Sequence, residues 1–155
     1  MLSGAEIKQF QKLVKKIKKP ELQQEVFDSL VEVVPFAACE MVIVNKQNEI
    51  LLTWREDGIW KGWHFPGGLL RFGDSFEHRL KQVARIELGT KLKSHKFLLP
   101  INYKGIGRGH TVSFLFVCQL TGQPKDGKFF KAMPKDIIPD HKLTWKKVRG
   151  VLRKK

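Results

Sequence analysis

The sequence predicts a single α/β domain, and three observations lead to this prediction. The chain has 155 residues, which is close to the usual size of one domain. Apolar residues make up 42% of it and charged residues 28%, a balance typical of folded proteins. Segments of helical periodicity alternate with segments that read as strands. No repeat or low-complexity linker divides the chain, so we expect an N-terminal helical segment at 1–34 and a core at 35–155.

The first 34 residues are expected to form two helices. Ser3 and Glu6 have the spacing of a capping box, which predicts the start of the first helix. Its apolar residues recur at helical intervals and are Phe10, Leu13, Val14 and Ile17. Pro20 ends this pattern and suits the first turn of a second helix, which ends before Pro35. The apolar face of the second helix comprises Leu22, Val26, Phe27 and Leu30.

A hairpin and a glycine-containing turn are expected next. Residues 37–44 and 49–54 read as strands, and the polar turn 45–48 joins them. After a loop, Pro66 and the two glycines that follow it end any strand. Glycine there allows the backbone to approach a ligand closely.

A helix with well-marked ends follows the glycines. Asp74 and Glu77 have capping-box spacing, and Gly89 stands just beyond the last apolar residue, Leu88. The remaining pattern predicts strands at 96–103, 111–120 and 142–145, with a loop at 104–110, an irregular stretch at 121–140 and a basic C-terminal helix.

The charge and the cysteines limit the partners and the compartment. Lys and Arg outnumber Asp and Glu by 29 to 15, a formal charge of +14 that favours phosphate-bearing partners. The apolar runs are only strand-length and no secretory signal is recognisable, so we expect no membrane partner. Cys39 and Cys118 belong to no metal or redox motif. We therefore expect buried, reduced cysteines in a cytoplasmic protein.

The segment from Gly68 to Thr90 resembles the Nudix box, G-x5-E-x7-R-E-U-x-E-E-x-G-U, where U is aliphatic. The first Gly, first Glu, last Glu and final Gly of the box correspond to Gly68, Asp74, Glu87 and Gly89. The departures are Gln82 for Arg, Val83 and Ile86 for two Glu residues, and Thr90 for the aliphatic residue.

These departures change the expected metal site. Carboxylates three and four residues apart share one helix face, so the complete box can hold several Mg²⁺ ions. Here Glu87 alone remains of that cluster. From Pro35 to Gly89 the chain resembles the GDP-mannose mannosyl hydrolases, a Nudix branch that also lacks the two inner glutamates. The resemblance implies an α/β/α sandwich with a mixed β-sheet and a hydrolase that uses one Mg²⁺ ion.

The resemblance also implies the residues of the site. In that branch the carbonyl of the second Gly, the last Glu and a residue before a catalytic His bind the metal, which correspond to Gly68, Glu87 and Asp140. His141 would accept a proton from water, and Arg55 would stabilise the departing diphosphate. Besides Arg55, the residues expected to contact the substrate are Glu40, Arg71, which would replace an Arg missing at Leu69, and His110 beside a glycine-rich loop.

Several alternatives remain open. In the resembling branch water attacks the sugar carbon, so the products are a sugar and a nucleoside diphosphate. Another Nudix pyrophosphohydrolase would release two monophosphates, and a weakly catalytic module would bind a nucleotide or nucleic acid through the positive charge. Asp74 can equally be an N-cap, and Asp140, His141 and Arg55 ordinary surface residues. The tryptophans Trp54, Trp60 and Trp63 can either stack on a base or pack in the core or a loop. The oligomeric state is open as well, with a homodimer as one alternative.

Overall fold

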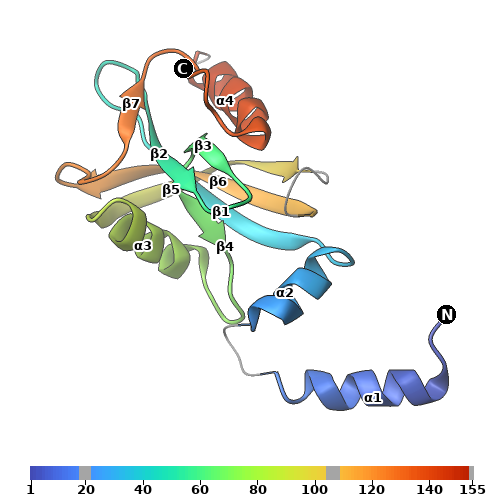
Figure 1. Ribbon diagram of the computed structural model, residues 1–155. Coiled ribbons are helices and arrows are strands. Elements are labelled where there is room, and N and C mark those ends of the chain that lie inside the picture. Colours follow the sequence, from blue (N-terminus) through green and yellow to red (C-terminus); the bar gives the residue numbers. More distant parts are fainter. Residues whose placement is uncertain (18–21, 104–108, 154–155) are drawn as a thin grey trace.

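The computed structural model describes residues 1–17, 22–103 and 109–153. Figure 1 shows a mixed α/β arrangement whose strands form two sheets. The first sheet has the order β4-β1-β6-β5, in which β1 and β6 are parallel and the other neighbours antiparallel. Its strands are β1 (Phe36–Val42), β4 (Gly67–Leu69), β5 (Lys91–Tyr103) and β6 (Thr111–Thr121). The second, antiparallel sheet has the order β3-β2-β7, with β2 (Ile50–Glu56), β3 (Lys61–His64) and β7 (Lys128–Phe130).

Helices α3 (Phe76–Glu87) and α4 (Pro139–Leu152) lie on opposite sides of the strands (Figure 1). Successive side chains of a strand point to opposite faces, so β1 contributes to two cores. Cys39 and Met41 belong to a core with Leu80 and Ala84 of α3. Val42 instead belongs to a core with Trp145 and Val148 of α4. The α/β/α sandwich with a mixed sheet that the sequence analysis expected is confirmed.

The N-terminal segment forms two helices. In α1 (Gly4–Val14) the predicted capping box is present, since the Ser3 hydroxyl accepts from the Glu6 amide and the Glu6 carboxylate accepts from the Ser3 amide. No residue of α1 is buried, and the helix lies away from the strands in Figure 1. The second helix, α2 (Gln24–Val31), begins later than predicted, and Pro20 lies outside the described residues. Within the described ranges, no helix has the length and apolar character needed to cross a bilayer.

The predicted hairpin exists only near its turn. Val44 and Ile50 form an isolated bridge, and the Leu51 amide donates to the Ile43 carbonyl at 2.9 Å. Beyond these residues β1 and β2 diverge into different sheets, because β6 and β4 pair with the two edges of β1. The glycines expected to end a strand instead form the short strand β4.

Residues 142–145 are helical, so the predicted strand there is wrong. Pro139 occupies the start of α4, where its missing N–H costs nothing, and Thr144, Trp145 and Val148 are buried at helical spacing. A segment of four residues is too short for its apolar spacing to distinguish a strand from a helix. The stretch read as irregular contains β7, and of the loop 104–110 only residues 109 and 110 are described.

Both cysteines are free and buried, as predicted. Burial raises the pKa of Cys39 and of Cys118 to about 12. At neutral pH both are therefore thiols that pack as small apolar groups.

Candidate active site

A cavity of about 210 Å³ lies where β1, β3 and β4 meet α2 and the first turn of α4. Five of the residues singled out from the sequence line it, namely Glu40, Arg55, Gly68, Asp140 and His141. Trp60 also lines it, whereas Trp54 and Trp63 pack edge to face with ring centroids 5.3 Å apart. Phe27 and Val31 of α2 form part of its wall, so the N-terminal segment helps to shape the cavity.

Glu40 is a buried carboxylate in the middle of β1, on the face that looks toward α4. Its oxygens accept hydrogen bonds from the Ser113 hydroxyl at 2.9 Å and from the Tyr103 hydroxyl at 3.1 and 3.2 Å. Burial raises the pKa of Glu40 to about 7, although these hydrogen bonds and the charge of Arg55 lower it. The side chain can therefore gain or lose a proton near neutral pH.

Glu87, at the end of α3, reaches back to the first residue of β4. It accepts from the Gly67 amide at 3.4 Å and from the Thr53 hydroxyl at 3.3 Å. Burial raises its pKa to about 7, and Arg55 is the largest of the influences that lower it. Glu87 does not line the cavity itself, but its hydrogen-bond partner Gly67 does, so the carboxylate lies just behind the cavity wall.

Arg55 is the cation of this region. Its side chain is 30% exposed and lies 3.8 Å from Asp57, measured from Nε to Oδ2. Its charge lowers the pKa values of Glu40 and Glu87 and also those of His64 and His141. The charge of Arg55 therefore opposes the effect of burial on both glutamates.

His141 lies in the first turn of α4 and stacks on Phe65 and Tyr103, with ring centroids 5.9 Å away in each case. Its Nδ1 accepts a hydrogen bond from the Phe65 amide at 3.0 Å. Burial lowers its pKa well below the usual value, so the ring is neutral. A neutral imidazole that accepts through Nδ1 carries its hydrogen on Nε2. With its hydrogen on Nε2, the ring can donate a hydrogen bond through that atom, and the catalytic role expected of His141 stays a prediction.

His64 is a buried histidine that the sequence analysis did not assign to the site. Its Nδ1 donates to the Phe65 carbonyl at 2.8 Å, and its Nε2 lies 3.0 Å from the Thr53 hydroxyl. Burial lowers its pKa to about 3. This neutral ring holds Thr53 beside Glu87, and nothing in its sequence spacing indicated that position.

Arg71 and His110 lie outside the cavity lining. Arg71 lines an adjoining groove of about 800 Å³, which shares Phe27, Phe36, Gly68 and Leu69 with the cavity. His110 is hydrogen-bonded to Asn102 across the ends of β5 and β6. Both remain candidates for contact with the outer parts of a substrate.

The donors present suit a weakly held divalent cation. Within the described part of the chain, no three His, Cys, Asp or Glu side chains are close enough together to hold a metal ion. Mg²⁺ needs only one or two protein carboxylates when phosphate oxygens and waters complete its coordination. Glu87 beside the cavity and Asp140 in its lining supply such carboxylates, and burial raises the pKa of both. These two carboxylates are therefore the candidates for holding a divalent cation at this cavity.

Arg79 holds the loop between β4 and α3, a residue that the sequence analysis did not single out. Its guanidinium bonds Asp74 through Nε at 2.9 Å and through Nη2 at 2.6 Å, and it donates to Gln82 at 2.9 Å. The helix N-cap is Ser75, whose hydroxyl accepts from the His78 amide at 3.1 Å, so the assignment of Asp74 as cap was wrong by one residue. Arg79 lies one helical turn before Gln82, the box position where Arg was expected.

Gly67 and Gly68 differ in what surrounds them. A Cβ on Gly67 would lie 2.7 Å from the Cys39 carbonyl oxygen and 2.8 Å from the Glu40 Cγ, which is too close. A Cβ on Gly68 would meet only Arg79 and Val83 at an ordinary 3.7 Å. Gly67 is therefore the residue that allows β4 to pack against Glu40.

Comparisons with known proteins agree with this arrangement. The NUDIX domain family matches residues 35–148, more than half of the chain. A MutT NUDIX hydrolase from Burkholderia pseudomallei is 19% identical, with a TM-score of 0.65 over 73% of this chain and 97% of that one. The NUDIX domain of Shewanella oneidensis NrtR, complexed with ADP ribose, is 17% identical, with a TM-score of 0.59 over 84% of this chain and 99% of that one. These structures share the fold, and the family match shows that the chain belongs to the NUDIX family.

Proposed function

We propose that the protein is a Mg²⁺-dependent hydrolase of a nucleoside diphosphate-linked substrate, with a nucleotide sugar such as GDP-mannose as the first candidate. The observation that carries this proposal is the cavity that brings Glu40, Arg55 and Asp140 together beside Glu87. A diphosphate between Arg55 and a cation held by the carboxylates would be neutralised from two sides. The continuity of the cavity with the larger groove offers space for the rest of a nucleotide sugar.

The metal would be held by Glu87 and Asp140, with the Gly68 carbonyl as the third candidate. When bound, it would act as a Lewis acid on the diphosphate and lower the barrier for departure of the nucleoside diphosphate. Arg55 would stabilise the same negative charge and orient the diphosphate.

Glu40 is the group that we assign as proton acceptor. His141 offers a hydrogen on Nε2 while Phe65 occupies Nδ1, so it is suited to donate a hydrogen bond to substrate. Glu40 lines the cavity and has a pKa of about 7, close to the best value for a base at neutral pH. Ser113 and Tyr103 hold its carboxylate in place through their hydroxyls.

The test is a screen of nucleoside diphosphate sugars with Mg²⁺, in which the products are identified. We expect Glu87→Gln to lower kcat/KM by about a hundredfold or more, since it removes a charged ligand of the metal. Glu77→Gln is the control, because Glu77 lies on the same helix and pairs with Lys81 in solvent. Release of sugar plus nucleoside diphosphate supports attack at carbon, and two monophosphates support attack at phosphorus. Equal activity of Glu87→Gln and the parent would refute the metal assignment.

A second candidate function is a binding module with little catalysis. The helix that carries several carboxylates in the complete box here has Val83 buried in the core and Ile86 exposed. This candidate predicts nucleotide binding, or strongly salt-dependent binding of nucleic acid, without Mg²⁺-dependent turnover. The same screen, combined with titrations of nucleotide and RNA at two salt concentrations, separates it from the hydrolase.

A further inference from the structure

Helix α1 presents an apolar face that the described part of the protein leaves open. Ile7, Phe10, Leu13 and Val14 recur at intervals of three and four residues and therefore share one face. Their exposed fractions are 44%, 54%, 53% and 44%. Globular proteins seldom leave so many large apolar side chains together in water. Such a face marks a contact surface.

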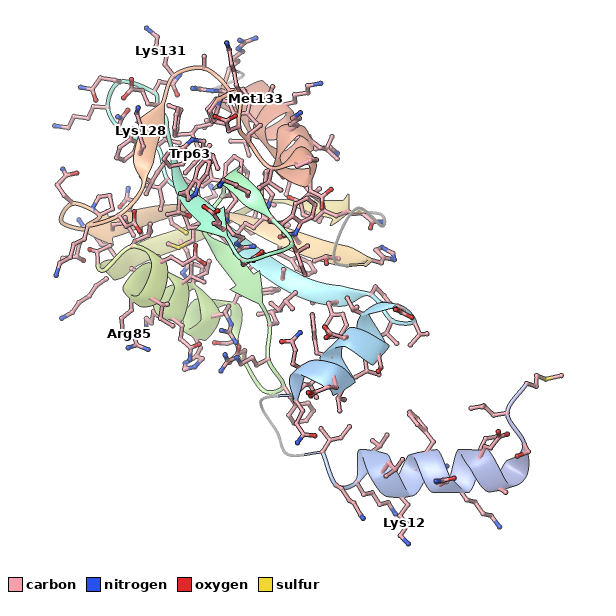
Figure 2. The ribbon with its side chains drawn as sticks, in the orientation of Figure 1. Lys12, Trp63, Arg85, Lys128, Lys131 and Met133 are labelled. Carbon is pink, nitrogen blue, oxygen red and sulfur yellow. The ribbon has the colours of Figure 1, made fainter. Side chains whose placement is uncertain are left out.

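The opposite face of the same helix is basic. Lys8, Lys12 and Lys15 follow one another at intervals of four and three residues and are exposed. Figure 2 shows Lys12 extending from α1 away from the strands and the other helices. The acidic residue of the helix, Glu6, is engaged in the capping box with Ser3. The helix is therefore amphipathic, with lysines as its polar face.

An eleven-residue helix is marginally stable in water unless its apolar face is covered. The capping box of α1 satisfies amides at its first turn, which favours the helix. No residue of α1 is buried against the rest of the described chain, however. The stability of α1 therefore depends on a surface that both covers the apolar side chains and accepts the lysines.

We propose that α1 is an interfacial anchor that binds the surface of an anionic lipid bilayer. A bilayer buries the apolar face at the boundary of its acyl chains, and its acidic headgroups pair with the lysines. Nucleic acid would explain the lysines but not the aliphatic residues. A second copy would cover the apolar face but bring a second formal charge of +14 close to the first. The proposal departs from the expectation of no membrane partner, because that expectation concerned membrane-spanning segments and the proposal concerns lipid at the surface.

The apolar surface continues from α1 toward the body of the protein. Val14 and Ile17 line the groove of about 800 Å³, together with Leu70 and Phe72 of the loop after β4. Phe72 is 70% exposed. Lipid contact along α1 would therefore reach only the edge of the groove that Val14 and Ile17 form.

Vesicle binding by the complete protein tests the proposal. The probes are sedimented vesicles of phosphatidylcholine alone and of phosphatidylcholine with phosphatidylglycerol. We expect binding to the mixed vesicles, and a loss of affinity of more than about tenfold in both Phe10→Gln/Leu13→Gln and Lys8→Gln/Lys12→Gln. High salt should weaken binding of the parent.

Two matched controls carry the same chemical changes elsewhere. Ile86→Gln/Leu143→Gln removes two exposed apolar side chains from α3 and α4, and Lys131→Gln/Lys135→Gln removes two exposed lysines. Both should bind like the parent, and thermal unfolding checks that all variants fold. Four results would each overturn the proposal: equal binding to neutral vesicles, unchanged binding by the α1 variants, binding of RNA that only the α1 variants lose, or a dimer that the same variants dissociate.

Discussion

Arg79 hydrogen-bonds both Asp74 and Gln82 at the start of α3. Asp74 and Arg79 have side chains only 10% and 8% exposed, and they form a doubly hydrogen-bonded pair. Burial alone would raise the pKa of Asp74, but the hydrogen bonds from Arg71 and Arg79, with the charge of Arg79, lower it overall. One arginine thus ties the start of α3 to the loop that carries Arg71.

The Arg79 pair can be tested by stability. Arg79→Ala should lower the free energy of unfolding by about 2 kcal/mol, because it removes two charge-assisted hydrogen bonds to the Asp74 carboxylate and leaves that of the Arg71 amide. Gln82→Ala should cost less than about 1 kcal/mol, since it removes one hydrogen bond of a partly exposed side chain. The pKa of Asp74 is lower in the folded than in the unfolded protein, so its ionised form stabilises the fold above about pH 4. The cost of Arg79→Ala should therefore shrink as the pH falls below about 4. Denaturant titrations at neutral and acidic pH measure both effects, and equal costs for the two variants would contradict this role.

The buried Glu40 should make the free energy of unfolding depend on pH. Its folded pKa of about 7 lies above the unfolded value of about 4.5, so the folded state favours the protonated form. Its stabilising contribution is present below pH 4.5 and is lost as the pH rises through 7. Relative to the parent, Glu40→Gln should therefore gain about 3 kcal/mol of stability between pH 4.5 and 8.

Denaturant titrations of both proteins across this range give the difference directly. Comparing the two proteins removes the opposing contributions of His64 and His141, which are common to both. A difference that does not change with pH would show that Glu40 is ionised throughout. Loss of turnover in Glu40→Gln, with KM retained, would support its assignment as proton acceptor.

Strand β4 places the turn glycines against β1, and the two glycines have unequal roles. Gly67→Ala would force its new methyl group onto the Cys39 carbonyl and the Glu40 side chain, whereas Gly68→Ala has room. We expect Gly67→Ala to lower the free energy of unfolding by about 2 kcal/mol and to lower activity as well. Gly68→Ala is the control for stability and should unfold near the temperature of the parent. Thermal unfolding and initial rates measure the effects, and equal tolerance at the two positions would contradict the close packing of β4.

Helix α4 depends on contacts made far away in sequence. Trp63 of β3 bridges to Ile137, and the Ile138 amide donates to the Trp63 carbonyl at 2.9 Å. These bonds hold the start of α4, so Asp140 and His141 enter the cavity from its first turn. The sequence also allowed His141 to lie in an exposed loop, where its position would not be fixed in this way.

At the scale of the whole molecule, α1 and α2 make different contributions. Removal of residues 1–16 takes away no buried side chain, so thermal unfolding should stay within a few degrees of the parent. Removal of residues 1–34 also takes Phe27, whose ring packs 5.0 Å from Phe36, and Val31 from the cavity wall. The longer deletion should therefore reduce activity much more than the shorter one, which takes only Val14 from the outer groove. Comparable loss of activity in both would assign α1 a role in the cavity.

Local patterns in the sequence were enough for the class of fold and for much of the cavity. The capping box of α1 and the terminal Gly89 of α3 depend on neighbours a few residues away, and Gly89 indeed has a positive φ of 59°. Gly68, Glu87 and Gly89 identified the Nudix box because they lie at fixed spacings within one short segment. These signals are local, so one sequence suffices to read them.

Long-range packing decided the remainder. The separation of β1 and β2 into two sheets follows from the pairing of β1 with β6, more than sixty residues later. The helical state of residues 142–145 follows from burial of Trp145 and Val148 beneath the strands. The tautomer of His141 depends on the Phe65 amide, and the burial of Glu40 depends on Tyr103 and Ser113. Proton positions and pKa values are set by partners distant in sequence, which a local pattern cannot contain.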